Sequence, residues 1–294
     1  KKFYLSSDAE ITIEANPGTL NKNKLRDFKK IGINRLSIGI QSFNNNELKF
    51  LTRIHDSQTA VKTVLEAKNS DFENISIDLI FNLPNQTKKI WLENLEQAVN
   101  LPIKHLSAYS LILEPGTILK KMVIDGKVKI QDEDYDAELY ELTMDFLTNY
   151  GFVQYEVSNF AIRGFECIHN NSYWRYKDYF GFGTSAHSFI DGKRWWNYSS
   201  LNFYLESINK KNNAIIGEEV LTQNQMLDEY VMLALRSSGL DTKDFKSRFG
   251  SNWLNEKESL IQGMIENGFI KREEEKLKLT SKGYTICDEI IRNL

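Results

Sequence analysis

Asp78 is a carboxylate inside an otherwise apolar run, residues 75–81 (ISIDLIF). Burying an unpaired carboxylate is costly or shifts its pKa, so this side chain needs a hydrogen-bond donor as a partner. A ribose diol would suit it, because two hydroxyls can donate to one carboxylate. We therefore interpret Asp78 as a ligand-binding residue.

Three further polar residues follow apolar runs: Glu14, Gln41 and Arg53. Glu14 can accept hydroxyl or ammonium donors, and the planar guanidinium of Arg53 is suited to bidentate binding of a carboxylate. Considered singly, Glu14 is better explained by hydrogen bonds from loop amides and Arg53 by a solvated charge. For Gln41 the sequence supports a structural and a functional interpretation equally. Together with Asp78, the three predict a site for a small polar ligand.

A second group of candidates lies in an aromatic-rich segment, residues 169–198, which is flanked by His169 and His187. A single histidine is most often a hydrogen-bonded core or surface group. Among tyrosines and tryptophans it could instead ligate a flat metal macrocycle. Cys167 lies two residues before His169, but one such pair without further ligands is no metal site.

The elements that carry the first group are four short apolar runs, each ending in polar residues and a turn. Helical patterns separate them, and this alternation predicts strand–helix units around a parallel sheet, as a barrel or an open doubly wound sheet. No glycine-rich phosphate-binding fingerprint follows a strand, which disfavours dinucleotide binding. The predicted strands are residues 10–16, 35–43, 74–84 and 105–113, and the helices are 20–31, 58–67 and 90–101.

The pattern changes after residue 113. We expect a helix at 132–150, a strand at 151–160 and then the aromatic-rich segment, which we interpret as a loop-rich wall or a packed cap. Helices at 226–235, 241–249 and 254–267, a hairpin at 269–280 and a last helix at 281–294 resemble a winged helix. Acidic residues slightly outnumber basic ones there, so a protein-facing or lid role is favoured over DNA binding.

Composition excludes several classes of protein. The 294 residues carry a net charge of −3, which gives no reason to expect a nucleic-acid partner. No apolar run approaches the length of a membrane span, and the start of the chain has no signal-peptide core. The two cysteines, Cys167 and Cys287, lie far apart, so we expect free thiols and a cytoplasmic location.

Several segments together resemble radical S-adenosylmethionine proteins of the oxygen-independent coproporphyrinogen III oxidase group, and within it the HemW-type heme chaperones. The resemblance extends from about residue 8 to the winged-helix-like region. The matching segments are 10–19 (EITIEANPGT), 34–43 (NRLSIGIQSF), 51–55 (LTRIH), 78–87 (DLIFNLPNQT), 155–161 (YEVSNFA), 169–174 (HNNSYW) and 179–188 (YFGFGTSAHS).

The resemblance implies an α/β fold: a partial TIM-type barrel at residues 1–200, including the aromatic-rich extension, and a helical, winged-helix-like domain at 201–294. It implies that Glu14, Gln41, Arg53 and Asp78 bind S-adenosylmethionine. Arg53 would hold the methionine carboxylate, and Gln41 and Asp78 the ribose hydroxyls. The segment 169–174 matches an HNxxYW motif associated with heme binding, which makes the heme candidates His169, Tyr173 and Trp174.

The sequence departs from the family in its missing cluster motif. A CxxxCxxC motif, which would hold a 4Fe-4S cluster, and a following glycine-rich segment are both absent, so we expect them upstream of Lys1 and expect no cluster in this chain. Smaller departures are Thr52 and Asn82, where the family usually has glycine, and the pair Thr184-Ser185 within a GxGxxAH stretch.

The resemblance implies that the full-length protein binds heme, a 4Fe-4S cluster and S-adenosylmethionine and passes heme to membrane or cytosolic acceptor proteins. The alternative is an enzyme that oxidatively decarboxylates coproporphyrinogen III by way of a 5′-deoxyadenosyl radical. A third possibility is an inactive paralogue without a cluster. The motifs favour the chaperone.

Overall fold

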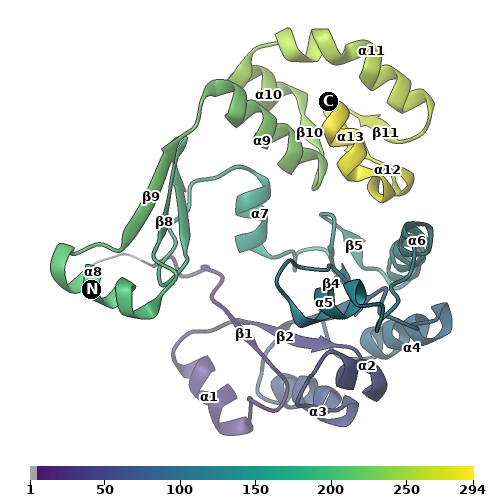
Figure 1. Cartoon of the computed structure of the whole chain (residues 1–294), viewed down its shortest axis with the longest axis vertical. Coiled ribbons are helices and arrows are strands. Elements are labelled where there is room, and N and C mark those ends of the chain that lie inside the picture. The colour runs from purple at the N-terminus through teal and green to yellow at the C-terminus, as the bar shows by residue number, and fades with distance from the viewer. Residues whose placement is uncertain (1–4) are drawn as a thin grey trace. The chain divides into compact units, whose positions relative to one another are not determined.

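The computed structural model describes residues 5–294 (Figure 1). The chain forms two compact units, Lys1–Glu166 and Cys167–Leu294, and each is described by itself. Within residues 5–294, every helix is too short or too polar to cross a membrane.

A six-stranded sheet forms the centre of the first unit, with strand order β1-β2-β3-β4-β6-β5. The first four strands are parallel, and β6 runs antiparallel to both β4 and β5. This confirms the predicted α/β fold with a parallel sheet. The strands are β1 (Thr12–Ala15), β2 (Arg35–Gln41), β3 (Asn74–Phe81), β4 (His105–Ser110), β5 (Val153–Gln154) and β6 (Asn159–Ala161).

Helices connect these strands and pack against the sheet: α3 contacts β3, and α6 contacts α4 and β4. Polar residues fix where the main connecting helices begin. The side chains of Asn21, Asp56 and Thr87 each accept a backbone N–H from the first turn of α1, α3 and α4. The helices are α1 (Lys22–Lys30), α2 (Asn45–Phe50), α3 (Ser57–Lys68), α4 (Lys88–Val99), α5 (Ile118–Ile124) and α6 (Glu133–Asn149).

The two faces of the sheet differ in polarity. On β2, Leu36, Ile38 and Ile40 are completely buried, whereas the alternate positions Ser37 and Gly39 are small. Because successive side chains of a strand point to opposite faces, the apolar set packs beneath the helices and the small set lines the inner face. The inner face therefore has room and polarity for a ligand.

The second unit contains two three-stranded sheets and seven helices among its described elements. The sheet β7-β8-β9 lies in the aromatic-rich half, and the sheet β10-β12-β11 accompanies α9, α10 and α11. The winged-helix-like prediction expected the three helices and the hairpin β11-β12, but not β10. The elements are α7 (Ile168–Trp174), β7 (His187–Ile190), β8 (Lys193–Asn197), α8 (Leu201–Lys211), β9 (Ile215–Val220), α9 (Gln223–Leu235), β10 (Leu240–Asp241), α10 (Thr242–Phe249), α11 (Asn252–Glu266), β11 (Ile270–Glu273), β12 (Lys276–Leu279), α12 (Ser281–Thr285) and α13 (Cys287–Asn293).

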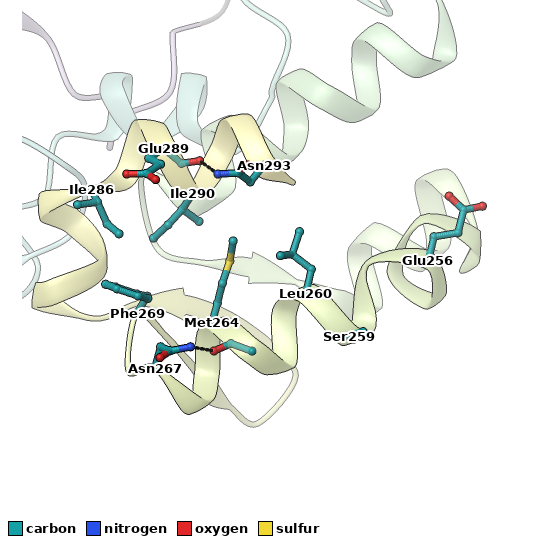
Figure 2. A pocket seen from close by; sticks show the side chains of 11 residues that line it. Glu256, Ser259, Leu260, Met264, Asn267, Phe269, Ile286, Glu289, Ile290 and Asn293 are labelled. Atoms are coloured by element: carbon teal, nitrogen blue, oxygen red, sulfur yellow. Dashed lines mark hydrogen bonds between the residues drawn. The ribbon is translucent and has the colours of Figure 1, made fainter.

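A cavity of about 600 Å³ opens between α11 and α13 in this unit. Leu260, Met264, Phe269 and Ile290 form its apolar lining, with Glu256 and Glu289 among the polar lining residues (Figure 2). None of the residues predicted to bind a ligand lines this cavity.

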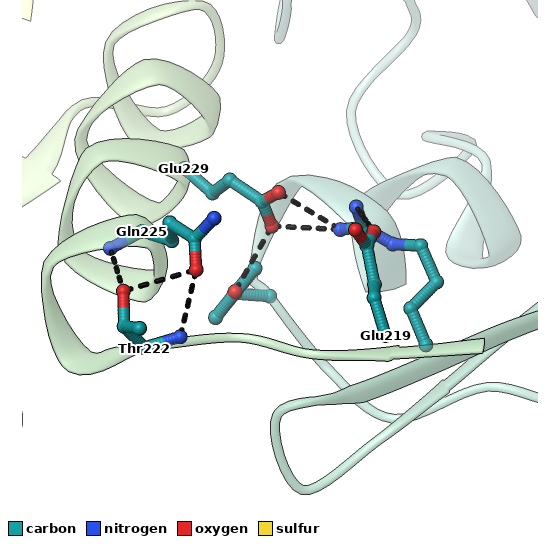
Figure 3. Close-up of polar contacts among 6 residues, drawn as sticks. Glu219, Thr222, Gln225 and Glu229 are labelled. Carbon is teal, nitrogen blue, oxygen red and sulfur yellow. Dashed lines mark hydrogen bonds and ion pairs between the residues drawn. The ribbon is translucent and has the colours of Figure 1, made fainter.

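The aromatic-rich segment belongs to the second unit, whereas the sequence assigned it to a first domain ending at residue 200. Contacts with α9 give the physical reason. Glu229 on α9 accepts hydrogen bonds from Arg194 on β8, at 2.8 and 3.0 Å, and from the Tyr176 hydroxyl, at 3.0 Å (Figure 3). A capping box between Thr222 and Gln225 begins α9 and so fixes the position of Glu229.

Local structure differs from expectation at several places. The predicted strand 151–160 is two short antiparallel strands, because a tight turn, in which Tyr155 N–H donates to the Asn159 carbonyl, interrupts it. The predicted last helix breaks at Ile286 into α12 and α13. The sequence also missed α2, α5, α7, α8 and the sheet β7-β8-β9.

Candidate functional site

The register of the first unit's sheet places polar side chains side by side on its inner face. Glu14 on β1 lies opposite Ser37 on β2. Asp78 on β3 lies opposite Ser107 on β4, which in turn lies opposite Asn159 on β6. Directly opposed residues point to the same face. The parallel strands thus bring together two of the four predicted residues, Glu14 and Asp78.

Asp78 is a strongly perturbed carboxyl of this face. Burial raises its pKa to about 6, and the negative charge of Glu14 adds to the increase, while hydrogen bonding from Ser107 and Ser37 and the charge of Arg35 oppose it. A donor-bearing ligand would offset the cost of burying the charge. This environment fits an acceptor of ligand hydroxyls.

Gln41 ends β2 in a left-handed backbone conformation, with a φ of 72°, next to a register shift between Ile38 and Gln41. Its side-chain amide folds back over Gly39, where an added Cβ would lie 2.7 Å from Gln41 Nε2. A side chain at position 39 would displace this amide. The backbone strain and the adjacent glycine fix Gln41 at the carboxyl end of the strand.

Arg53 follows α2, after a turn in which Thr52 has a φ of 55°. Its backbone N–H donates to the Leu48 carbonyl at 2.9 Å, but its side-chain Nε is buried with no hydrogen-bond partner among residues 5–294. An unpaired buried donor of a guanidinium is costly. An anionic ligand group, such as a carboxylate, would satisfy it.

His55, two residues beyond Arg53, has a structural role. The side chain is 6% exposed, and burial lowers its pKa, so the imidazole is neutral at pH 7. Its Nε2 lies 3.1 Å from the Ile40 carbonyl, to which it can donate. The contact secures the backbone immediately before Gln41.

Glu156 and Asn159 extend the polar face and were not predicted as site residues. Burial raises the pKa of Glu156 to about 7, and both Glu156 Oε1 and Asn159 Oδ1 are buried without a hydrogen-bond partner in the described part of the chain. Burial raises the pKa of the Tyr109 hydroxyl, and the negative charges of Asp78 and Glu156 add to the increase. The signal in the sequence was weak, because a carboxylate in the mixed run YEVSNF does not contrast with its neighbours.

The heme candidates lie together on α7 in the second unit. His169 and Tyr173 are one helical turn apart, with ring centroids separated by 4.8 Å in an edge-to-face arrangement. Tyr173 also contacts Tyr179 at 4.5 Å. His169 is exposed, and Tyr173 and Trp174 are half-buried. The helix thus presents a histidine beside aromatic rings.

The two cysteines do not form a cluster site. Cys167 and Cys287 are 3% and 5% exposed and both belong to the second unit. Across residues 5–294, no group of three His, Cys, Asp or Glu side chains is arranged to hold a metal ion.

Comparison with known families agrees with the fold. Residues 1–98 match the model of the Radical SAM superfamily, and residues 221–286 match the model of the HemN C-terminal domain. The solved structure of coproporphyrinogen III oxidase (HemN) from Escherichia coli, a radical SAM enzyme, superposes with a TM-score of 0.80. It covers 98% of this chain and 70% of that chain at 23% identity, which shows a shared fold. The fold is therefore that of a radical SAM protein with a HemN-type C-terminal domain.

Sequence relatives narrow the family. The heme chaperone HemW of Bacillus subtilis is 35% identical over 97% of this chain and 76% of its own length. The heme chaperone HemW of Lactococcus lactis is 33% identical over 96% and 74%. This chain belongs to the HemW family of radical SAM proteins.

Proposed function

We propose that this protein binds heme through α7 and delivers it to acceptor proteins in the cytoplasm or at a membrane surface. The observation that carries the proposal is the pairing of an exposed His169 with the edge-to-face ring of Tyr173. An imidazole is a common axial ligand of heme iron, and aromatic rings pack well against a porphyrin. Its HemW relatives are named heme chaperones, which supports the same function here.

We further propose that Glu14, Gln41, Arg53 and Asp78 bind S-adenosylmethionine on the inner face of the sheet. The buried, unpaired Nε of Arg53 fits the methionine carboxylate, and the Asp78 carboxyl fits the ribose hydroxyls. When bound next to a reduced 4Fe-4S cluster, S-adenosylmethionine supplies a 5′-deoxyadenosyl radical. The residues of this chain would bind and orient the nucleoside.

A 4Fe-4S cluster does not fit the residues present. Three thiolates are needed for the family's motif, and the 294 residues include two buried cysteines that are 120 positions apart. No step of the proposed function is therefore assigned to a cluster held by this chain.

A heme titration tests the chaperone function. We expect a shifted Soret band on addition of hemin, loss of most of that shift in His169→Ala, and transfer of the heme to apomyoglobin as a generic acceptor. His187→Ala is the matched control, because His187 is the other exposed histidine of the aromatic-rich segment. An unshifted Soret band, or formation of product from coproporphyrinogen III by the full-length protein reconstituted with a cluster, would overturn the proposal.

A further inference from the structure

Glu47 is a buried carboxylate whose partners are all neutral. The residue lies on α2 and is 8% exposed. Ser42 Oγ lies 2.5 Å from Glu47 Oε2, Gln86 Nε2 donates to Oε1 at 2.9 Å, and Asn94 Nδ2 donates to Oε2 at 3.3 Å. Each donor is itself at most 2% exposed. The carboxylate is the centre of a buried hydrogen-bond network.

This network fixes the turns that follow two strands of the candidate site. Beyond β2, Phe43 N–H donates to Asn94 Oδ1 at 2.5 Å, next to the bonded Ser42. Beyond β3, Asn82 N–H donates to Gln86 Oε1 at 2.8 Å. The backbone after Gln41 and the backbone after the strand of Asp78 are therefore joined through one side chain.

A strained residue lies where each of these turns meets its strand. Gln41 has a φ of 72° and Asn82 a φ of 60°, conformations that side-chain-bearing residues rarely adopt. Such conformations persist only where the surrounding structure enforces them. The hydrogen bonds to Ser42, Phe43 and Asn82 supply that enforcement.

We propose that Glu47 is a positioning residue for the nucleoside site: it holds the turns after β2 and β3 so that Gln41 and Asp78 present their side chains to the same ligand. The inference rests on the proposed binding of S-adenosylmethionine by these residues. Within residues 5–294, Glu47 forms no hydrogen bond with any of the four proposed binding side chains.

The pattern of donors and acceptors makes Glu47→Gln a sharp test. A glutamine amide at position 47 has one oxygen where the carboxylate has two. If this oxygen faces Gln86 Nε2, Asn94 Nδ2 loses its acceptor at position 47; if it faces Ser42 and Asn94, the new N–H group opposes the Gln86 amide N–H group. If Gln86 rotated to present oxygen to residue 47, Asn82 N–H would lose its acceptor. One hydrogen bond is therefore broken in either orientation, and the loss falls on the turn after β2 or the turn after β3.

Glu47→Gln combined with Gln86→Glu restores the pattern. The carboxylate at position 86 can accept from both Asn82 N–H and the new amide at position 47, while the amide oxygen at position 47 accepts from Ser42 and Asn94. The double variant keeps the net charge and the side-chain volumes. It therefore separates loss of the network from loss of a charge at one position.

Amide hydrogen exchange of the whole chain measures how strongly the network stabilises the two turns. In Glu47→Gln we expect amide exchange of residues 42–46 and 80–86 to be about tenfold faster, as for the loss of one buried hydrogen bond, and near wild-type exchange in the double variant. Glu93→Gln, on the exposed side of α4, is the control and should leave exchange unchanged. Unchanged exchange in Glu47→Gln, or acceleration that the double variant fails to reverse, would overturn the proposal.

Nucleoside discrimination measures the consequence for the site. We expect wild type to bind adenosine more tightly than 2′-deoxyadenosine, Glu47→Gln to lose most of this preference, and the double variant to regain it. A preference retained in Glu47→Gln despite faster exchange would refute the positioning role. A wild-type chain without any preference would instead refute the ribose assignment to Gln41 and Asp78, and the exchange result would still decide whether Glu47 holds the turns.

Discussion

A carboxyl whose pKa is near 6 changes charge close to neutral pH, and Asp78 is such a group. Hydroxyl donors of a ligand favour its ionised form, so the proton must leave before the ligand binds tightly. Binding should therefore strengthen as pH rises through 6. We expect adenosine to bind about tenfold more weakly at pH 5 than at pH 7, measured by calorimetry or NMR titration.

Asp78→Asn should remove this pH dependence, because an amide does not titrate. Asp27→Asn changes an exposed carboxyl on α1 and serves as the control. Equal affinity of wild type at pH 5 and pH 7 would contradict the assignment of Asp78 as an acceptor of ligand hydroxyls.

Glu156 should make the folding stability decrease as pH rises, whereas ligand affinity at Asp78 should increase. Its pKa is about 7 in the fold and near 4.5 in the unfolded chain, so the folded state holds an extra proton between these values. Stability contributed by this proton is present below pH 4.5 and is lost as pH rises through 7, by up to about 3 kcal/mol. Urea unfolding between pH 5 and pH 8 measures the loss.

Glu156→Gln should flatten this dependence and exceed wild type in stability at pH 8. Glu96→Gln alters an exposed carboxyl of α4 and should follow the wild-type curve. A wild-type stability that rises from pH 5 to pH 8, with no difference in Glu156→Gln, would rule out the neutral buried acid.

The turn after α2 shows how a strained residue shapes an element. Thr52 is β-branched and exposed, yet it has a φ of 55°. The resemblance expected glycine at this position, and the left-handed backbone gives the physical reason. We expect Thr52→Gly to stabilise the chain by about 1 kcal/mol in chemical denaturation, because relief of strain exceeds the entropy cost of glycine. Thr12→Gly, in the extended backbone of β1, should instead destabilise it.

The strands of the first unit were predictable because their two faces contrast. In β2, completely buried Leu36 and Ile38 alternate with small or polar residues, and the run ends at a turn. The sheet β7-β8-β9 gave no such contrast, since aromatic residues such as Trp195 and Trp196 occupy adjacent positions on both faces. The helix α7 was missed because HNNSYW has no apolar period.

The same contrast with neighbouring residues decided which site residues could be predicted from the sequence. Asp78 stands out as a charge in an apolar run, so the sequence singled it out. Glu47 and Glu156 do not stand out, since each lies in a polar segment and becomes buried only through contacts distant in sequence, such as that of Glu47 with Gln86. The roles of Glu14, Gln41, Arg53, Asp78 and of the α7 residues remain predictions that the experiments above address.

At the scale of the whole molecule, the chain should be a poor host for an iron–sulfur cluster. Both thiols are buried, and burial raises the pKa of Cys287 to about 11, which keeps it protonated and unreactive at pH 8. We expect slow reaction with a disulfide reagent in the native state, two thiols on denaturation, and no cluster absorbance after anaerobic incubation with iron and sulfide. Stoichiometric cluster formation by the 294-residue chain would contradict this.

The edge position of β1 affects how the site assembles. The strand pairs with β2 on one side and, within residues 5–294, with no strand on the other, yet it carries Glu14. Strands bonded on one side open locally at a lower free energy than central strands. A ligand that contacts Glu14 must therefore offset the entropy that β1 loses when it becomes ordered. Part of the binding free energy is used to order this strand. Ligand binding should therefore slow amide hydrogen exchange in β1. Exchange in the central strand β3, which is already rigid, should not change.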